Sequence, residues 1–258
     1  MNYNNKNVAT MKKTSLIAAF VSLMVSACSI YHPQAVDMPL INHKGDVRVE
    51  ADMSMSAWLA PDAVNMNVTG STGITDWLAG QLHFNYGGDN AYMQVAPGAY
   101  LNLGENSVLE GYAGFGYGGV WRNADGTSSR KDGESSSSSS YAYSGRYMLP
   151  FVQANIGWHD VGAAHFGFAF GLKAGAYMPD FEYNEFNANG EAIAHRYEHY
   201  TRGNLLLEPQ VQLSLGGEHV RWVSRLGFAW LSDVSAGEGS TTFMNDWFTV
   251  GTGIQLSF

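Results

Sequence analysis

The chain has 258 residues, a formal net charge of −9 at pH 7 and a single cysteine. The acidic balance argues against a nucleic-acid partner, and one cysteine excludes an internal disulfide or a metal site built from several thiolates. Only 14% of the residues are charged, while 13% are aromatic and 30 are glycine, which is unusual for a soluble enzyme. No stretch of 18 apolar residues follows residue 28, so no spanning helix is predicted there.

The first 28 residues have the layout of a secretory signal. Lys12 and Lys13 precede an apolar stretch, residues 16–25, that is too short for a spanning helix. The next residues, Val25-Ser26-Ala27-Cys28, resemble the lipobox of bacterial lipoproteins. This resemblance implies that lipoprotein-processing enzymes attach a diacylglycerol to the thiol of Cys28, cleave after Ala27 and acylate the new amino group with a fatty acid such as palmitate.

Residues 1–27 are therefore predicted to be a cleaved signal peptide, and the non-acidic Ser29 favours sorting to the outer membrane. Residues 28–45 contain Pro33 and Pro39 and no period, which indicates an extended tether with a reach of roughly 50 Å. The sequence leaves two placements open for this tether: in the periplasm, or inside the lumen of the following domain as a small plug.

From residue 46 to residue 258, apolar and polar residues alternate with the period of a β-strand. In the first segment Val47, Val49 and Ala51 lie on one face, and Arg48 and Glu50 lie on the other. Near Pro150 the alternation is least regular, and we expect a phase slip or bulge there. Ten segments follow this pattern: 46–59, 64–74, 77–86, 92–103, 108–121, 141–156, 163–178, 205–215, 220–233 and 247–258.

The connections between these segments alternate between two classes. One class is short, at 75–76, 104–106, 158–160 and 216–218, and the other holds every long insertion, at 122–140, 179–198 and 234–245. Short periplasmic turns and longer outward loops are typical of outer-membrane barrels. We therefore predict a closed antiparallel transmembrane β-barrel of about ten strands, with eight or twelve as alternatives, whose two ends and Cys28 lie on the periplasmic side.

Alternation does not say which face points inward. We expect the apolar face to contact the lipid bilayer, because the opposite face carries charges that suit a narrow lumen filled by ion pairs. Aromatic residues near strand ends fit interfacial girdles: Trp121, Tyr177, Trp222, Trp230, Trp247 and Phe258. The alternative is a tethered, lipocalin-like periplasmic barrel with its apolar face inside. The predicted lumenal polar network is Arg48, Glu50, Asp52, Glu110, Lys173, Glu208, Arg221 and Arg225.

The last seven residues, Thr252-Gly253-Ile254-Gln255-Leu256-Ser257-Phe258, match the polar, Gly, x, x, apolar, x, aromatic signature of outer-membrane barrels. The resemblance implies that Gly253, Leu256 and Phe258 form the signal read by the barrel insertion machinery.

Candidates for chemistry are few. His195-Arg196-Tyr197-Glu198-His199 spells the inverted zinc-peptidase motif, which works on a helix, whereas here it runs from a loop into a strand that would separate the two histidines by about 13 Å. We predict no metal, cofactor-binding or catalytic residues. A surface protease would draw on Asp180, Glu182, Glu185, Asp233 and His195, and a lipid hydrolase on Ser54, Ser56, His83 and His165.

These observations predict a non-enzymatic outer-membrane lipoprotein, anchored by acyl chains at its N-terminus, with a structural, adhesion or partner-binding role. An extracellular ligand is expected at loops 122–140 and 179–198. Alternatives are a narrow pore or ligand pathway for small solutes, and an outer-membrane protease or lipid hydrolase.

Overall fold

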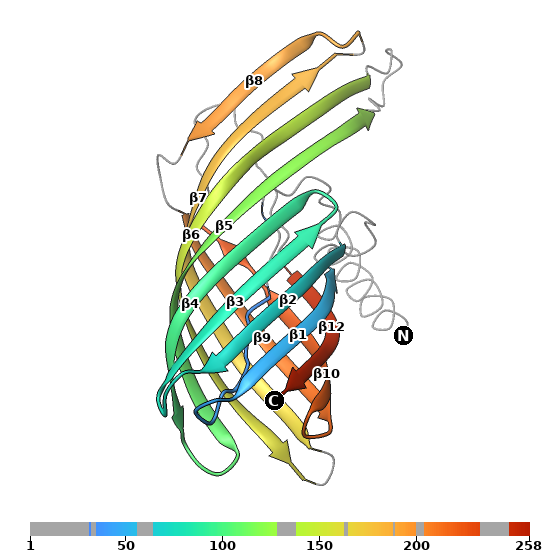
Figure 1. The fold of residues 1–258 in the computed structure, drawn as a ribbon. Helices are drawn as coiled ribbons and strands as arrows, with labels where there is room; N and C mark the ends of the chain where they lie inside the picture. Colours follow the sequence, from blue (N-terminus) through green and yellow to red (C-terminus); the bar gives the residue numbers. More distant parts are fainter. Residues whose placement is uncertain are drawn as a thin grey trace, which may run out of the picture.

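The computed structural model describes Tyr31 and residues 35–55, 64–127, 138–162, 165–187, 189–199, 204–232 and 248–258. These residues form one antiparallel β-barrel (Figure 1). The strands are β1 (Val47–Met55), β2 (Val64–Gly73), β3 (Leu78–Gly87), β4 (Asn90–Asn102), β5 (Ser107–Thr127), β6 (Ser138–Val161), β7 (Phe166–Phe186), β8 (Ala192–His199), β9 (Asn204–Gly216), β10 (Val220–Phe228), β11 (Trp230–Leu231) and β12 (Phe248–Ser257).

Ten of these strands close the barrel. Strands β1 to β7 pair in chain order, β7 pairs with β9, β9 with β10, β10 with β12, and β12 returns to β1. Strand β11 continues the line of β10 along β9, and β8 is a further strand on the outer part of β7. The predicted closed antiparallel barrel of ten strands is confirmed.

The two ends of the barrel differ as expected. Short turns at residues 74–77, 103–106 and 217–219, and a turn that follows Val161, lie at one end, which we call the turn side. The other end, the loop side, holds the longer connections. Strand β6 runs on to Val161, so the predicted turn at 158–160 belongs to the strand, and its register with β7 shifts between Trp158 and Val161.

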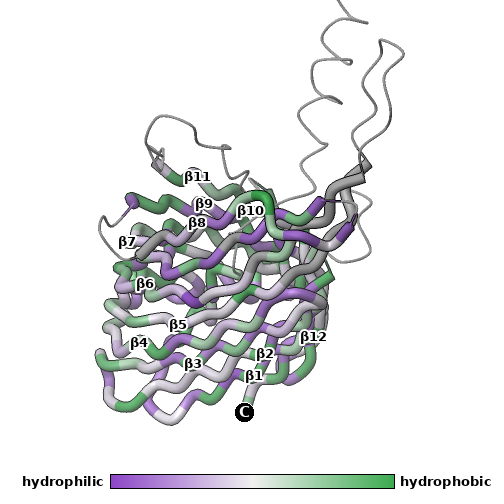
Figure 2. Tube along the Cα trace, turned by 90° about the horizontal axis from the view of Figure 1, so that it is seen from above, coloured by the Kyte–Doolittle hydropathy of each residue, from purple (hydrophilic) through white to green (hydrophobic). Residues whose placement is uncertain are grey.

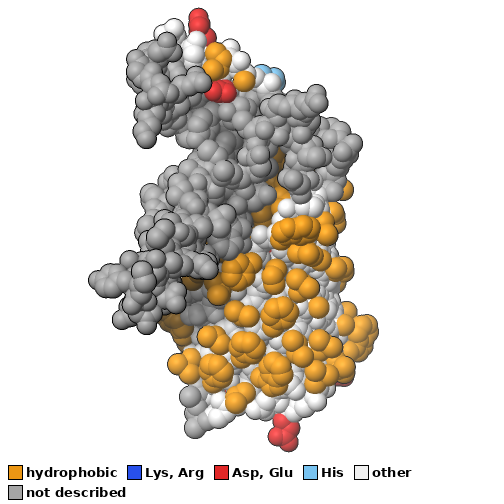
Figure 3. All heavy atoms as spheres, turned by 180° about the vertical axis from the view of Figure 1, so that it is seen from behind, with side chains coloured by type: hydrophobic (Ala, Val, Ile, Leu, Met, Phe, Trp, Pro, Cys, Tyr) orange, Lys and Arg blue, Asp and Glu red, His pale blue; other side chains and the backbone are white. Residues whose placement is uncertain are grey.

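The outer face of the barrel is apolar and the inner face is polar. Along β4, Met93, Val95 and Leu101 are more than half exposed, whereas the alternate Gln94 is buried. Figure 2 shows this alternation along the strands, and Figure 3 shows apolar side chains covering the outer wall. Exposed apolar surface of this extent is not stable in water, so the wall suits contact with lipid. The alternative prediction of a lipocalin-like barrel with an apolar interior is therefore wrong.

Two segments predicted as loops are largely strand. Strands β5 and β6 stay paired up to Thr127 and Ser138, and β7 continues to Phe186, where β8 pairs with it. Together they form a four-stranded extension above the loop side of the barrel (Figure 1). Polar composition suggested loops there, but each strand finds a ladder partner in the neighbouring hairpin, and backbone hydrogen bonds do not depend on side-chain hydropathy.

The predicted phase slip at Pro150 is absent from β6. Leu149 and Phe151 are both buried, and the register with β7 is the same before and after Pro150. Near Pro150 only the pairs at 149 and 150 are missing from the ladder with β7, which fits a residue that has no N–H to donate. The run of apolar residues around Pro150 thus hides an unbroken alternation.

The predicted aromatic girdle is partly wrong. Trp121, Trp222, Trp230 and Phe258 are exposed on the outer face, but Tyr177 is fully buried in the lumen. The residues directly before and after it on β7, Ala176 and Met178, are on the outward side, so the parity of the strand places Tyr177 inside. Trp247 lies outside the described residues.

Among the described residues, no helix is both long and apolar enough to span a bilayer.

Candidate functional site

The most unusual feature of the barrel is what fills it. Tyr31 and residues 35–41 are buried, and together with Asn42 they make contacts with the inner faces of strands all around the barrel. We call Tyr31 and residues 35–42 the lumenal segment. Its trace runs inside the barrel down to the start of β1 (Figure 1).

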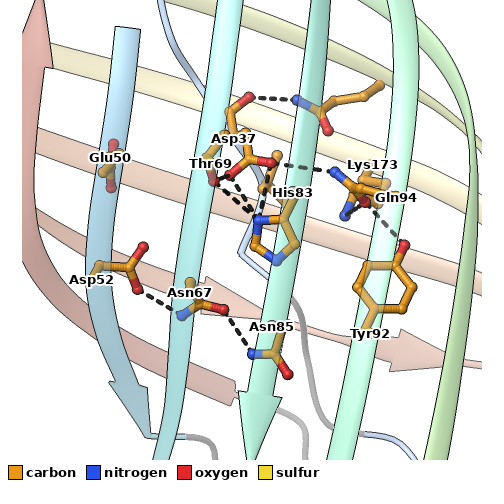
Figure 4. Close-up of polar contacts among 12 residues, drawn as sticks. Asp37, Glu50, Asp52, Asn67, Thr69, His83, Asn85, Tyr92, Gln94 and Lys173 are labelled. Carbon is orange, nitrogen blue, oxygen red and sulfur yellow. Dashed lines mark hydrogen bonds and ion pairs between the residues drawn. The ribbon is translucent and has the colours of Figure 1, made fainter.

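Asp37 is the hub of the contacts between this segment and the wall. Its carboxylate, 1% exposed, accepts a hydrogen bond from the hydroxyl of Thr69 at 2.7 Å and one from the amide of Gln94 at 3.3 Å. The Nδ1 atom of His83 lies 3.2 Å from both carboxylate oxygens. Figure 4 shows these side chains pointing toward Asp37 from β2, β3 and β4. Three adjacent strands therefore each contribute one polar group to a single buried carboxylate.

The main chain of the segment is also held by wall side chains. The carbonyl oxygen of Asp37 accepts hydrogen bonds from Gln153 at 2.6 Å and Asn155 at 3.0 Å on β6. On β9, Gln210 accepts from the Val36 N–H at 2.6 Å, and Gln212 donates to the Met38 carbonyl. Since an extended segment has no ladder of its own, these amides replace the partners that its backbone needs.

Glu110 and Arg48 hold the segment nearer the turn side. Glu110 accepts the Ile41 N–H at 2.8 Å and the amide of Asn155 at 2.9 Å. The guanidinium of Arg48 donates to the Pro39 carbonyl. The two predicted lumenal charges are thus linked through the lumenal segment.

A second cluster of charge is centred on Arg225 of β10. Its guanidinium lies 2.5 Å from Glu50 and 2.8 Å from Asp52, and it donates to Gln212 at 2.9 Å. Asp52 also accepts from Asn67 at 2.7 Å, and Asn67 accepts from Asn85 (Figure 4). A buried arginine needs such partners, because an unpaired buried charge costs several kcal/mol.

The remaining predicted lumenal charges have other partners. Lys173 is fully buried, 3.7 Å from Glu208 and 3.1 Å from the Gln94 oxygen, with its ammonium over the ring of Phe151. Arg221 pairs at 2.5 Å with Asp160, an acid that the sequence analysis did not select. All eight residues predicted for the polar network face the lumen, with Arg48 partly exposed and the other seven buried.

Tyrosine rings pack against one another in the part of the lumen nearer the loop side. The ring of Tyr31 lies 5.1 Å from that of Tyr177 and 6.1 Å from that of Tyr147, and its hydroxyl donates to Glu208 at 2.7 Å. Tyr92 stacks on Tyr147 at 5.9 Å. The glycines of β5 make room for these rings, since a Cβ at Gly116 would lie 2.1 Å from the Tyr92 hydroxyl oxygen.

The catalytic candidates do not converge. Asp180 is held by Arg146 at 3.3 Å and by the Tyr197 hydroxyl at 2.7 Å, and His195 lies 3.7 Å from Glu182. His195 and Glu182 are exposed on the extension, whereas Asp180 is buried. Strand β8 contains the H-x-x-E-H sequence, so the motif lacks the helix on which it binds zinc.

The other predicted chemical residues are scattered. His83 lies 3.2 Å from Asp37, and Ser54 accepts a hydrogen bond from Asn67. His165 lies 3.1 Å from Asp160 at the turn side. Glu185 pairs in the ladder with Ala194. Within the described ranges, no three His, Cys, Asp or Glu residues are grouped so that they could hold a metal ion. Cys28, Ser56 and Asp233 lie outside the described residues.

The residues of the insertion signature lie on the strand that closes the barrel. A Cβ at Gly253 would lie 2.3 Å from the Ala51 carbonyl oxygen, so β1 and β12 approach closely there. Leu256 and Phe258 point outward, with Phe258 74% exposed. The terminal residue exchanges backbone hydrogen bonds with Val47.

Sequence reasoning missed the hub of the lumen. Asp37 lies in a stretch without periodicity, and its partners Thr69 and Gln94 are uncharged side chains. The polar faces of β3, β4, β6 and β9 did indicate that the lumen is filled, because their glutamines and asparagines at alternate positions would have no partner inside an empty barrel. These amides were not among the residues predicted for the lumenal network, which are all charged.

No family model matches the sequence, and no curated protein matches it. Among solved structures, the chain is similar to the outer-membrane protease OmpT from Escherichia coli, with a TM-score of 0.52 and 9% identity over 83% of this chain and 94% of that one. The translocator domain of the autotransporter NalP from Neisseria meningitidis matches with a TM-score of 0.41 and 12% identity over 97% of both chains. At 9% identity the likeness to OmpT concerns the fold alone, which is that of an outer-membrane β-barrel.

Proposed function

We propose that this protein is a lipid-anchored barrel of the bacterial outer membrane whose lumen is occluded by its own N-terminal segment, and that it acts by binding a partner rather than by conducting solutes. The observation that carries the proposal is the burial of residues 35–41 inside the ring of strands. A segment held from β2, β3, β4, β6 and β9 at once is part of the folded core.

The size of the barrel supports occlusion. Ten strands enclose a narrow lumen, whereas the porins that leave a wide aqueous channel have 16 to 18 strands. Here the lumen holds the lumenal segment, the Arg225 cluster and the tyrosine rings of residues 31, 92, 147 and 177. A pore or ligand pathway for small solutes would require these groups to leave their partners.

The extension offers the surface for a partner. Strands β5 to β8 rise above the rest of the barrel, and β8 pairs with one neighbour only among the described residues. Ile193 and Tyr197 are exposed on β8 beside His195 and Glu182. An extracellular partner that contacts 122–140 and 179–198 would bind to this part of the chain.

Planar-bilayer conductance tests the occlusion. The wild-type protein is expected to give no stable open level, and deletion of residues 31–42 is expected to give one. Heat-modifiable mobility on gels shows whether the deletion variant still forms a barrel, and Asp37→Ala in the full chain gives a second variant with the segment present but loosened. A stable wild-type channel would overturn the proposal.

Metabolic labelling with palmitate tests the anchor. We expect label in the outer-membrane fraction of the wild-type protein and none in Cys28→Ala. Because the apolar wall holds the barrel in lipid by itself, Cys28→Ala is expected to need detergent for extraction. An unlabelled wild-type protein would contradict acylation, and label of equal intensity in Cys28→Ala would place the acylation at another residue.

A further inference from the structure

The lumenal segment has a direction, which the contacts along single strands reveal. On β9, Glu208 contacts Tyr31, Gln210 contacts Val36 and Gln212 contacts Met38. Strand β9 runs from the loop side to the turn side, so a higher residue number in the segment corresponds to a position closer to the turn side.

Strand β6 repeats this order. Tyr147 contacts the ring of Tyr31, Gln153 and Asn155 bind the Asp37 carbonyl, and His159 lies 3.4 Å from the amide of Asn42. On β4, Gln94 binds Asp37 near the loop side, and Asn102 binds the Asn42 carbonyl at the turn side. Three strands therefore agree that the segment crosses the barrel from the loop side to the turn side.

The two ends of this crossing lie at opposite mouths. At the turn side, Gly45 donates to the Gly73 carbonyl, and β1 begins at Val47 beside the C-terminal Phe258. At the loop side, Tyr31 packs against Tyr177, which is paired with Asn204, the residue at which β9 begins.

The length of chain between Tyr31 and Cys28 is too short to return to the turn side. Three residues span about 10 Å when fully extended. Tyr177 lies eleven residues along β7 from its turn-side end at Phe166, which is about 36 Å of strand, or about 28 Å along the axis of a tilted barrel. The loop-side rim, in contrast, lies at the level of Tyr31 itself.

We propose that the amino terminus of the processed chain leaves the barrel through the loop-side mouth, so that the acyl chains on Cys28 insert into the outer leaflet on the extracellular side. The lipid part of this proposal rests on the proposed acylation, whereas the direction of the segment does not. From the sequence we expected Cys28 at the periplasmic mouth, because the first strand begins there. The crossing of the lumen would carry Cys28 to the other side.

Thiol accessibility in intact cells tests this topology. Since Cys28 is the only cysteine and its thiol would be blocked by the lipid, Ile30→Cys introduces a single free thiol close to the anchor. Matched controls are Asn189→Cys in the exposed loop between β7 and β8, and Glu105→Cys in the exposed turn between β4 and β5. The probe is a maleimide that does not cross the outer membrane.

We expect Ile30→Cys to react in intact cells to the same extent as Asn189→Cys, while Glu105→Cys reacts only after the outer membrane is permeabilised. Reaction of Ile30→Cys only after permeabilisation would overturn the proposal. If the lumen shelters this thiol under both conditions, an epitope tag inserted after Ser29 decides: antibody binding to intact cells supports the proposal, and binding only to permeabilised cells refutes it.

Failure of the proposed function would look different. The mass of the amino-terminal peptide shows whether Cys28 is acylated, independently of the side of the membrane on which it lies. Conductance of the wild-type protein shows whether the lumen is occluded. A peptide without acyl mass would refute the lipid anchor, but the thiol labelling would still show the direction in which the chain crosses the barrel.

Discussion

Removing the carboxylate of Asp37 should release the lumenal segment while leaving the barrel closed. In Asp37→Ala the donors on Thr69, His83 and Gln94 lose their shared acceptor. The hydrogen bonds that join the strands do not involve this side chain. The perturbation therefore acts on the position of the segment in the lumen.

The magnitude follows from the burial of the site. Deleting one partner of a buried hydrogen-bonded charge costs about 3–5 kcal/mol, because the groups left behind have no water to replace it. Each 1.4 kcal/mol changes an equilibrium about tenfold, so the fraction of time that the segment is displaced should rise by about two to three and a half orders of magnitude. Asp37→Asn keeps an acceptor for Thr69 and should give a smaller increase.

The rate of thiol labelling at Met38→Cys measures this displacement. Met38 is 1% exposed, so a maleimide reaches position 38 only when the segment moves. Asp37→Ala should accelerate the reaction by the factor above, and Asp76→Ala, which removes an acid from an exposed turn, should leave it unchanged. Equal labelling rates in the two backgrounds, with the barrel still heat-modifiable, would refute the view that Asp37 anchors the segment.

Two further substitutions probe the wall. Arg225→Met leaves Glu50 and Asp52 buried without their cation and should lower the free energy of unfolding by about 3–5 kcal/mol, measured by urea titration in lipid vesicles; an unchanged midpoint would contradict the role of this cluster. Gly116→Ala brings a Cβ against the Tyr92 ring and should cost about 1–3 kcal/mol in the same titration, whereas Gly111→Ala, with open space at its Cβ, is the matched control.

The barrel could be predicted from the sequence because lipid and lumen impose opposite polarity on alternate residues. In β4 and β10 the apolar residues at alternate positions mark the outer face, and the long and short connections give the direction of the strands. The position of the charged residues on the lumenal face followed from the same parity. Which acid meets which base did not, since the pairing of Arg225 with Glu50 brings together residues 175 positions apart.

The lumenal segment could be proposed from the sequence but not placed. Its residues have no period, and its fixed position comes from amides such as Gln153 and Gln210, which belong to distant strands. The extension above the barrel escaped prediction for a related reason, because Ser138 and Thr127 are polar residues and their pairing is a backbone ladder. Contacts made by the main chain leave little trace in hydropathy.

The closed ring of strands around the lumenal segment has a topological consequence. The lumenal segment passes through this ring and continues into β1 at the turn side. With acyl chains beyond the loop-side mouth, as we propose, the chain would be interlocked with itself, and its amino-terminal end could not slide back through the lumen while the β1–β12 seam is paired. An end anchored in this way would have to be laid across an open sheet before the seam closes.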